Sequence, residues 1–183
     1  MLARGQGARP AIPLEPPKEG PSVEDLRIPD DVIESASTAE LVRLVFKTQE
    51  ARVTVAERFE DVFEHLVTGG RADEYAPLCD RFKPRLEAVN DNLERLAARM
   101  DKHPALMAMV QRVLQSEVKR IDLQLELQVL RQRLSVSAAD GLVREREKSQ
   151  VQSVQSQDEK LKGVIFETLE ELRCEAADLE EDD

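Results

Sequence analysis

The sequence predicts an all-α fold, an antiparallel up-down bundle of four long helices. Apolar residues recur every three or four positions along four stretches, at about 38–68, 75–102, 104–134 and 151–179, and this period is typical of amphipathic helices. Aromatic residues make up only 3% of the 183 residues, and tryptophan is absent, which favours long helices over sheets. Helices this one-sided must bury their apolar faces against one another or against a partner.

The first helix, at 38–68, has a recognisable start and end. Ser37 and Glu40 have the spacing of a capping box, in which each side chain accepts a hydrogen bond from the backbone of the other residue. We expect Gly69 and Gly70 to end the helix, because glycine adopts the left-handed conformation of a C-terminal cap without strain. The apolar face of this helix comprises Leu41, Leu44, Thr48, Ala51, Val55, Phe59, Val62 and Leu66.

Pro77 and Pro84 complicate the second helix, at 75–102. Proline costs about 3 kcal/mol in a helix interior, because it lacks the backbone donor and its ring clashes with the preceding turn. We therefore expect a short turn around 73–79, followed by a continuous helix that begins near Asp80. A continuous helix that is kinked at Pro84 is the alternative.

The third helix begins at Pro104 and carries apolar residues on more than one side, including Leu123, Leu127 and Leu130. This surplus predicts that it is the most buried element. Leu125 is expected to lie in the core, where Leu125→Asp would destabilise the fold by burying an unpaired charge. Residues 144–160 are nearly all polar and suit either an exposed helical extension or a flexible linker, and the apolar pattern returns at Leu161.

Three parts are predicted along the chain. Residues 1–36 form a disordered, proline-rich arm, since prolines prevent regular structure from propagating. Residues 37–179 form the helical bundle domain, and 180–183 form an acidic tail. An elongated three-helix core with a docked fourth helix, or an obligate dimer, would satisfy the same apolar pattern.

Charge and cysteine content restrict the partners. The net charge is −11, but the acids gather toward the two ends, and the helical body mixes both signs. We therefore expect no strong direct binding to nucleic acid.

No apolar run is long enough to span a membrane, and the opening residues lack the apolar stretch of a secretory signal. Cys79 and Cys174 are expected to be reduced thiols, with a disulfide across the bundle as the alternative.

No catalytic, cofactor-binding or metal-binding residue is predicted. His65 and His103 lack the glutamate three residues earlier that di-iron bundles use, and no histidine lies near Cys79 to activate it. Residues 81–85 form the densest basic cluster, which we expect to be solvated because Asp80 and Glu87 flank it. We expect a further basic face on the third helix to oppose the acidic tail, through Arg112, Lys119, Arg120, Arg131 and Arg133.

Several segments resemble the required-for-excision family, in its B-type domain. The likeness lies in residues 39–52, 59–66, 74–75 and, most closely, 160–173. It extends over about 38–179, fits poorly at 135–158, and leaves out the proline-rich arm.

The resemblance implies an accessory, non-enzymatic role in DNA excision repair, in the nucleus, with the cytoplasm as the other setting. It transfers no catalytic or ligand residue. The sequence therefore favours a helical adaptor that binds other proteins, with the third helix as the contact and homodimer formation left open. The alternative is a structural coiled-coil subunit of a cytoskeletal or trafficking complex.

Overall fold

The computed structural model describes residues 20–69, 71–136 and 141–181, apart from the helical side chains at 72, 135, 136 and 179–181. Within these ranges every regular element is a helix, which confirms the all-α class. In chain order they are α1 (Val23–Leu26), α2 (Asp30–Ser35), α3 (Thr38–Thr68), the short 3₁₀ helix η1 (Ala72–Glu74), α4 (Tyr75–Arg99), α5 (Pro104–Val136) and α6 (Gly141–Glu181).

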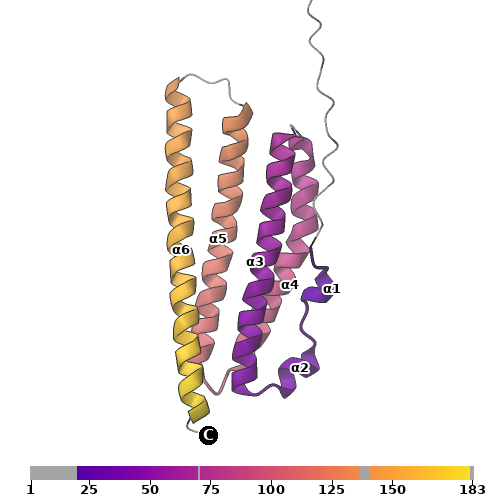
Figure 1. Cartoon of the computed structure of the whole chain (residues 1–183), viewed down its shortest axis with the longest axis vertical. Coiled ribbons are helices and arrows are strands. Elements are labelled where there is room, and N and C mark those ends of the chain that lie inside the picture. The colour runs from indigo at the N-terminus through magenta and orange to yellow at the C-terminus, as the bar shows by residue number, and fades with distance from the viewer. Residues whose placement is uncertain (1–19, 70, 137–140, 182–183) are drawn as a thin grey trace, which may run out of the picture.

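The four long helices lie side by side and alternate in direction (Figure 1). α3 packs against α4, α4 against α5, and α5 against α6, while α6 returns to contact α3. The closest pairings join α5 to α6 and α3 to α4, so the molecule consists of two helical hairpins. The α4–α5 turn lies at the base of the view, near the C-terminal end of α6 (Figure 1).

The start of α3 is the predicted capping box. The Ser37 side chain accepts a hydrogen bond from the Glu40 backbone N–H at 3.3 Å, and the Glu40 carboxylate accepts from the Ser37 N–H at 2.8 Å. The prediction that the two glycines end α3 is confirmed at Gly69, which is the C-cap with φ −79°, and the left-handed conformation belongs to the residue after the C-cap. Gly70 lies outside the described residues.

The predicted turn at 73–79 and helix start near Asp80 are wrong. α4 is continuous from Tyr75 and includes Pro84 in its interior, which agrees with the continuity of the alternative, and the kink of that alternative stays a prediction. Leu78 and Phe82 are buried on either side of the Asp80 position, and their packing offsets the cost of the proline. The Arg85 side chain donates to the Arg81 carbonyl at 2.7 Å, one residue after the Asp80 carbonyl that Pro84 leaves without its helical donor.

The predicted disordered arm is wrong for residues 20–36, which include α1 and α2, and residues 1–19 lie outside the description. Leu26 and Ile33 are buried. The buried Asn92 of α4 donates to the Leu26 carbonyl at 2.7 Å and accepts from the Ile28 N–H at 3.1 Å. Because side chains of α4 satisfy this backbone, the segment is folded although it contains Pro21 and Pro29.

α6 settles the choice that the sequence left open at 144–160. The helix begins at Gly141, so this polar stretch is a helical extension and not a linker. Most of its residues are exposed, but Val154 and Asp158 are buried. The helix also continues to Glu181, two residues beyond the expected end of the bundle domain at 179.

Two apolar clusters form the core. The first joins all four long helices near the base, through residues such as Val45, Leu93, Val110 and Leu172. The second is confined to α1, α3 and α4 and comprises Leu26, Val55, Phe63, Leu66, Leu78, Phe82, Ala88 and Val89. The upper parts of α5 and α6 therefore do not contribute to the second cluster.

The prediction that the third helix is the most buried element is wrong. Val118, Leu125 and Val129 of α5 are exposed, with 44%, 39% and 38% of their surface accessible. Eight of the 25 residues of α4 are buried, against seven of the 31 described side chains of α5 at 104–134. Val118, Leu125 and Val129 therefore face solvent, whereas Leu130 is buried and Leu123 and Leu127 are half-buried.

Candidate protein-interaction surfaces

The exposed apolar residues of α5 lie on one side of the helix. Val118 and Leu125 are seven residues apart, and Val129 follows four residues later. The half-buried Leu114 and Ile121 precede Val118 and Leu125 by four residues each. Spacings of four and three in alternation form a coiled-coil seam. We call Val118, Leu125 and Val129 the α5 face.

This seam is distinct from the one that α5 uses inside the bundle. The inward seam contains Leu106, Val110 and Val113, which are fully buried, and it continues through Glu117 and Gln128. An α-helix with two neighbouring apolar seams can pack against its own bundle and accept a further helix at the same time.

A buried polar layer crosses the middle of the bundle. The Arg52 guanidinium of α3 donates to the Asn90 side chain of α4 and lies 3.9 Å from the Glu117 carboxylate of α5. Arg120 of α5 donates to Glu117 at 3.2 Å and to Asp158 of α6 at 2.9 Å. The layer thus connects all four long helices through charged or polar side chains.

The polar layer is partly unsatisfied. Among the described residues, the buried Nε2 of Gln49 and Nε of Arg52 have no hydrogen-bond partner. Burial lowers the pKa of Arg52, and the Glu117 carboxylate opposes this shift. We expect a layer of this kind to contribute little net stability and to restrict which helices pair and in which register.

The two hairpins also meet through polar contacts above this layer. Tyr75 donates its hydroxyl to Gln128 at 2.8 Å, and Arg131 pairs with Glu60. Burial raises the pKa of Tyr75, so its hydroxyl remains a donor at any physiological pH. The hairpins therefore hold together by apolar packing at the base and by hydrogen bonds higher up.

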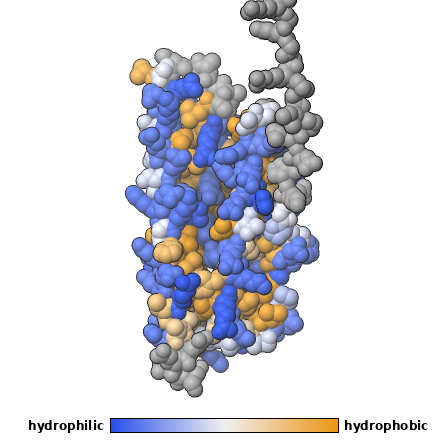
Figure 2. Space-filling view, viewed as in Figure 1, coloured by the Kyte–Doolittle hydropathy of each residue, from blue (hydrophilic) through white to orange (hydrophobic). Residues whose placement is uncertain are grey.

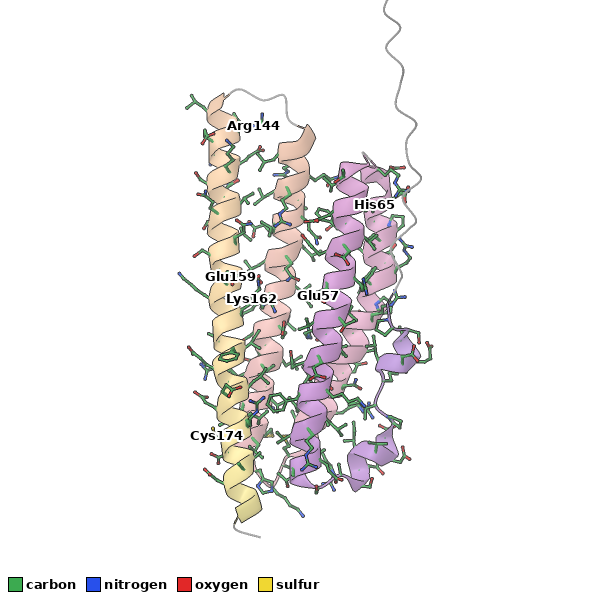
Figure 3. All side chains as sticks on the ribbon, viewed as in Figure 1. Glu57, His65, Arg144, Glu159, Lys162 and Cys174 are labelled. Atoms are coloured by element: carbon green, nitrogen blue, oxygen red, sulfur yellow. The ribbon has the colours of Figure 1, made fainter. Side chains whose placement is uncertain are left out.

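The histidines and cysteines are far from forming a site. His103 lies at the α4–α5 turn, where its Nε2 is 3.2 Å from the Thr38 hydroxyl, and His65 lies near the opposite end of α3 (Figure 3). Cys79 and Cys174 are both free, so the alternative of a disulfide is wrong. Among the described residues, no group of three His, Cys, Asp or Glu side chains could hold a metal ion.

The basic side chains of the two predicted clusters contact separate partners instead of forming one surface. In residues 81–85, Phe82 is buried, Arg85 donates to the Pro21 carbonyl at 2.9 Å, and Lys83 lies 3.7 Å from Glu87. On α5, Arg112 lies 3.8 Å from Glu171, while Arg120 and Arg131 pair with Asp158 and Glu60. These partners lie within the bundle, whereas the side chains of the acidic tail at 180–183 lie outside the described residues, so the expectation that this face opposes the tail stays a prediction.

The sequence analysis missed the polar layer. Arg52 follows Thr48 by four residues and precedes Val55 by three, so it occupies a position of the apolar face of α3. Glu117 likewise stands seven residues after Val110. A charged residue at an inward position of each of two helices was the available signal.

The sequence model of one family, described as DNA repair REX1-B, matches residues 40–131. The match includes most of α3, all of α4 and most of α5, together with the α5 face and the Arg52–Glu117 pair. It does not include 160–173, so the likeness of that segment stays a resemblance. No curated protein and no solved structure matches the chain. No described helix is long and apolar enough to cross a membrane. Since the match spans half of the sequence and confirms the resemblance to the required-for-excision B-type domain, the chain belongs to the DNA repair REX1-B family.

Proposed function

We propose that the protein is a non-enzymatic adaptor that acts in DNA repair in the nucleus by binding other proteins. The α5 face is the contact surface. The observation that carries this proposal is the exposure of Val118, Leu125 and Val129 along one side of a helix that lies inside the family match.

The partner segment is an amphipathic helix. Leu114, Val118, Ile121 and Leu125 follow one another at intervals of four, three and four residues, and this pattern admits the side chains of a second helix between them. Exposed large apolar residues that share one helix face mark contact surfaces more often than scattered ones do.

The charge distribution supports an indirect role at DNA. The net charge of −11 opposes the approach of a polyanion, and the arginines at 112, 120 and 131 are paired with carboxylates. We therefore expect that the protein reaches damaged DNA through a partner.

Binding to DNA tests this proposal directly. A fluorescein-labelled duplex, irradiated with ultraviolet light, is titrated with the purified protein at 0.15 M salt, and an undamaged duplex of the same sequence is the control. We expect no saturable binding to either duplex. Tight binding to the damaged duplex by the protein alone would contradict the adaptor proposal and indicate that the protein itself recognises damaged DNA. Normal ultraviolet survival of cells without the protein, with altered motility or transport, would favour the cytoskeletal or trafficking alternative.

A further inference from the structure

A shallow groove of about 260 Å³ lies between the N-terminal turns of α3 and the C-terminal part of α6. Small and apolar side chains line it: Ala39 and Phe46 from α3, and Ala176 and Ala177 from α6. The alanines leave room between the two helices that larger side chains would fill. On the face that Figure 2 shows, the apolar residues gather mainly in the lower half, where these parts of α3 and α6 lie.

Two arginines flank this apolar floor. Arg43 comes from α3 and Arg173 from α6, and both are exposed. The Arg173 guanidinium lies over the Phe46 ring, 4.9 Å from its centroid, and 3.1 Å from the Glu170 carboxylate. Stacking on a ring holds a guanidinium in one plane and leaves N–H donors at its edge for a carboxylate. Since the Glu170 pair is exposed, an incoming carboxylate can exchange with it at little cost.

The apolar lane continues along both helices. Phe166 precedes Arg173 by seven residues, and Val53 follows Phe46 by seven, so each lies two turns further along the same side of its helix. Phe166 and Val53 are exposed, at 65% and 50%. Because α3 and α6 are antiparallel, both lie at the same level above the groove.

We propose that the groove binds a short acidic segment of another protein, in which apolar side chains alternate with carboxylates. One apolar side chain enters between Phe46 and the alanines of α6, carboxylates pair with Arg43 and Arg173, and a second apolar side chain covers Phe166. Arg43 also attracts the exposed Glu40 carboxylate of its own helix, so at both arginines the incoming carboxylate exchanges with an exposed one. Charges beyond about 8 Å are screened at 0.15 M salt. This surface is separate from the α5 face and does not depend on the adaptor role proposed for it.

The probe is a fluorescein-labelled peptide of the sequence Gly-Asp-Leu-Asp-Glu-Phe-Glu-Asp-Leu-Gly. One control peptide carries Asn and Gln in place of the acids, and the other carries Ser in place of Leu and Phe. Fluorescence anisotropy at 0.15 M salt is expected to show saturable binding of the probe, and about tenfold weaker binding of each control.

The protein variants locate the site. The double variant that combines Arg43→Gln and Arg173→Gln is expected to bind the probe about tenfold more weakly, or weaker still. Arg144→Gln, at the far end of α6 (Figure 3), is the matched control and should leave binding unchanged. Since Arg173→Gln also removes the stacking on Phe46, Arg43→Gln alone is measured too. Ala177→Phe fills the groove at an exposed position and is expected to abolish binding, while circular dichroism reports that each variant is folded.

Three results would overturn the proposal. One is the absence of saturable binding up to millimolar peptide, and another is equal affinity of the folded Arg43→Gln variant and the native protein. The third is displacement of the probe by a single-stranded oligonucleotide at a lower concentration than by unlabelled peptide, which would reassign the two arginines to phosphate. A variant with Leu125→Gln should bind the probe normally, so failure at the α5 face and failure at this groove are told apart.

Discussion

Arg52 and Glu117 form a charge pair inside the bundle, with 3.9 Å between Nη1 and Oε2 and only 4% and 6% of their side chains exposed. They come from different hairpins, so the pair connects α3 to α5. Removing one partner of a buried pair leaves the other charge without compensation, which costs far more than the net contribution of the pair.

Glu117→Ala is therefore expected to destabilise the protein by about 3–5 kcal/mol. The double variant Arg52→Met with Glu117→Leu should be more stable than Glu117→Ala, because no uncompensated charge remains. Urea denaturation measures both. Glu171→Ala, in the exposed pair with Arg112, is the control and should change stability by less than about 1 kcal/mol. Equal effects of Glu117→Ala and Glu171→Ala would show that the Arg52–Glu117 pair is solvated.

Leu125→Gln and Leu93→Ala compare an exposed position of the α5 face with a buried position of the core. Leu93 is fully buried in the first apolar cluster, so Leu93→Ala should cost about 2–5 kcal/mol. Leu125 is 39% exposed, so Leu125→Gln should change the free energy of unfolding by about 0.5 kcal/mol or less. Thermal melting of both variants checks this. A large loss from Leu125→Gln would mean that this side chain packs inside the fold.

Gly163→Ala should stabilise the protein. Gly163 lies in the interior of α6, and a Cβ built there meets no atom within 4 Å. Alanine is favoured over glycine in a helix interior by about 0.5–1 kcal/mol. The expected result is a rise in melting temperature. A fall would indicate that this face of α6 is covered in solution, as by a second copy of the chain.

The capping box of α3 should weaken in acid. The Ser37 backbone N–H and, with a smaller effect, the Ser37 hydroxyl donate hydrogen bonds to the Glu40 carboxylate, and these bonds lower the pKa of Glu40 from its usual value of 4.5. A carboxyl whose pKa falls on folding stabilises the native state above its unfolded pKa, and this contribution is lost as the pH drops through the lower, folded value.

Glu40→Gln is accordingly expected to reduce stability at pH 7 and to have less effect once the pH falls below the lowered pKa of Glu40. Ser37→Ala should cost about 1 kcal/mol at neutral pH. Urea denaturation across this pH range provides the measurement. If Glu40→Gln had the same effect at every pH, the carboxylate charge would play no part in the cap.

The sequence predicted the elements that local patterns determine. The start of α3 at Ser37 and its apolar face follow from spacing alone, and so does the all-α class. The predictions were wrong where residues distant in the sequence determine the structure of a segment. Residues 20–36 fold because Asn92 and Arg95 of α4 satisfy the carbonyls of Leu26 and Ile28, and nothing local to that segment reveals those partners.

The remaining errors have the same origin. Pro84 is tolerated because Leu78 and Phe82 pack in the core, and local propensity does not include this packing. The surplus of apolar residues on α5 was visible, but the choice between a buried and an exposed second seam depends on whether another helix covers Leu125. In this chain none of the described helices does so fully.

Survival of ultraviolet-irradiated cells tests the central claim most directly. Cells that lack the protein are supplied with one of three proteins. The first is the native chain, and the second is the α5 variant, which combines Val118→Gln, Leu125→Gln and Val129→Gln. The third is the α6 control, which combines Leu142→Gln and Val143→Gln at two exposed apolar positions of a different helix. All three proteins are expected to melt alike when purified. The account predicts that the native chain and the α6 control restore survival and the α5 variant does not. Full restoration by the folded α5 variant would contradict it.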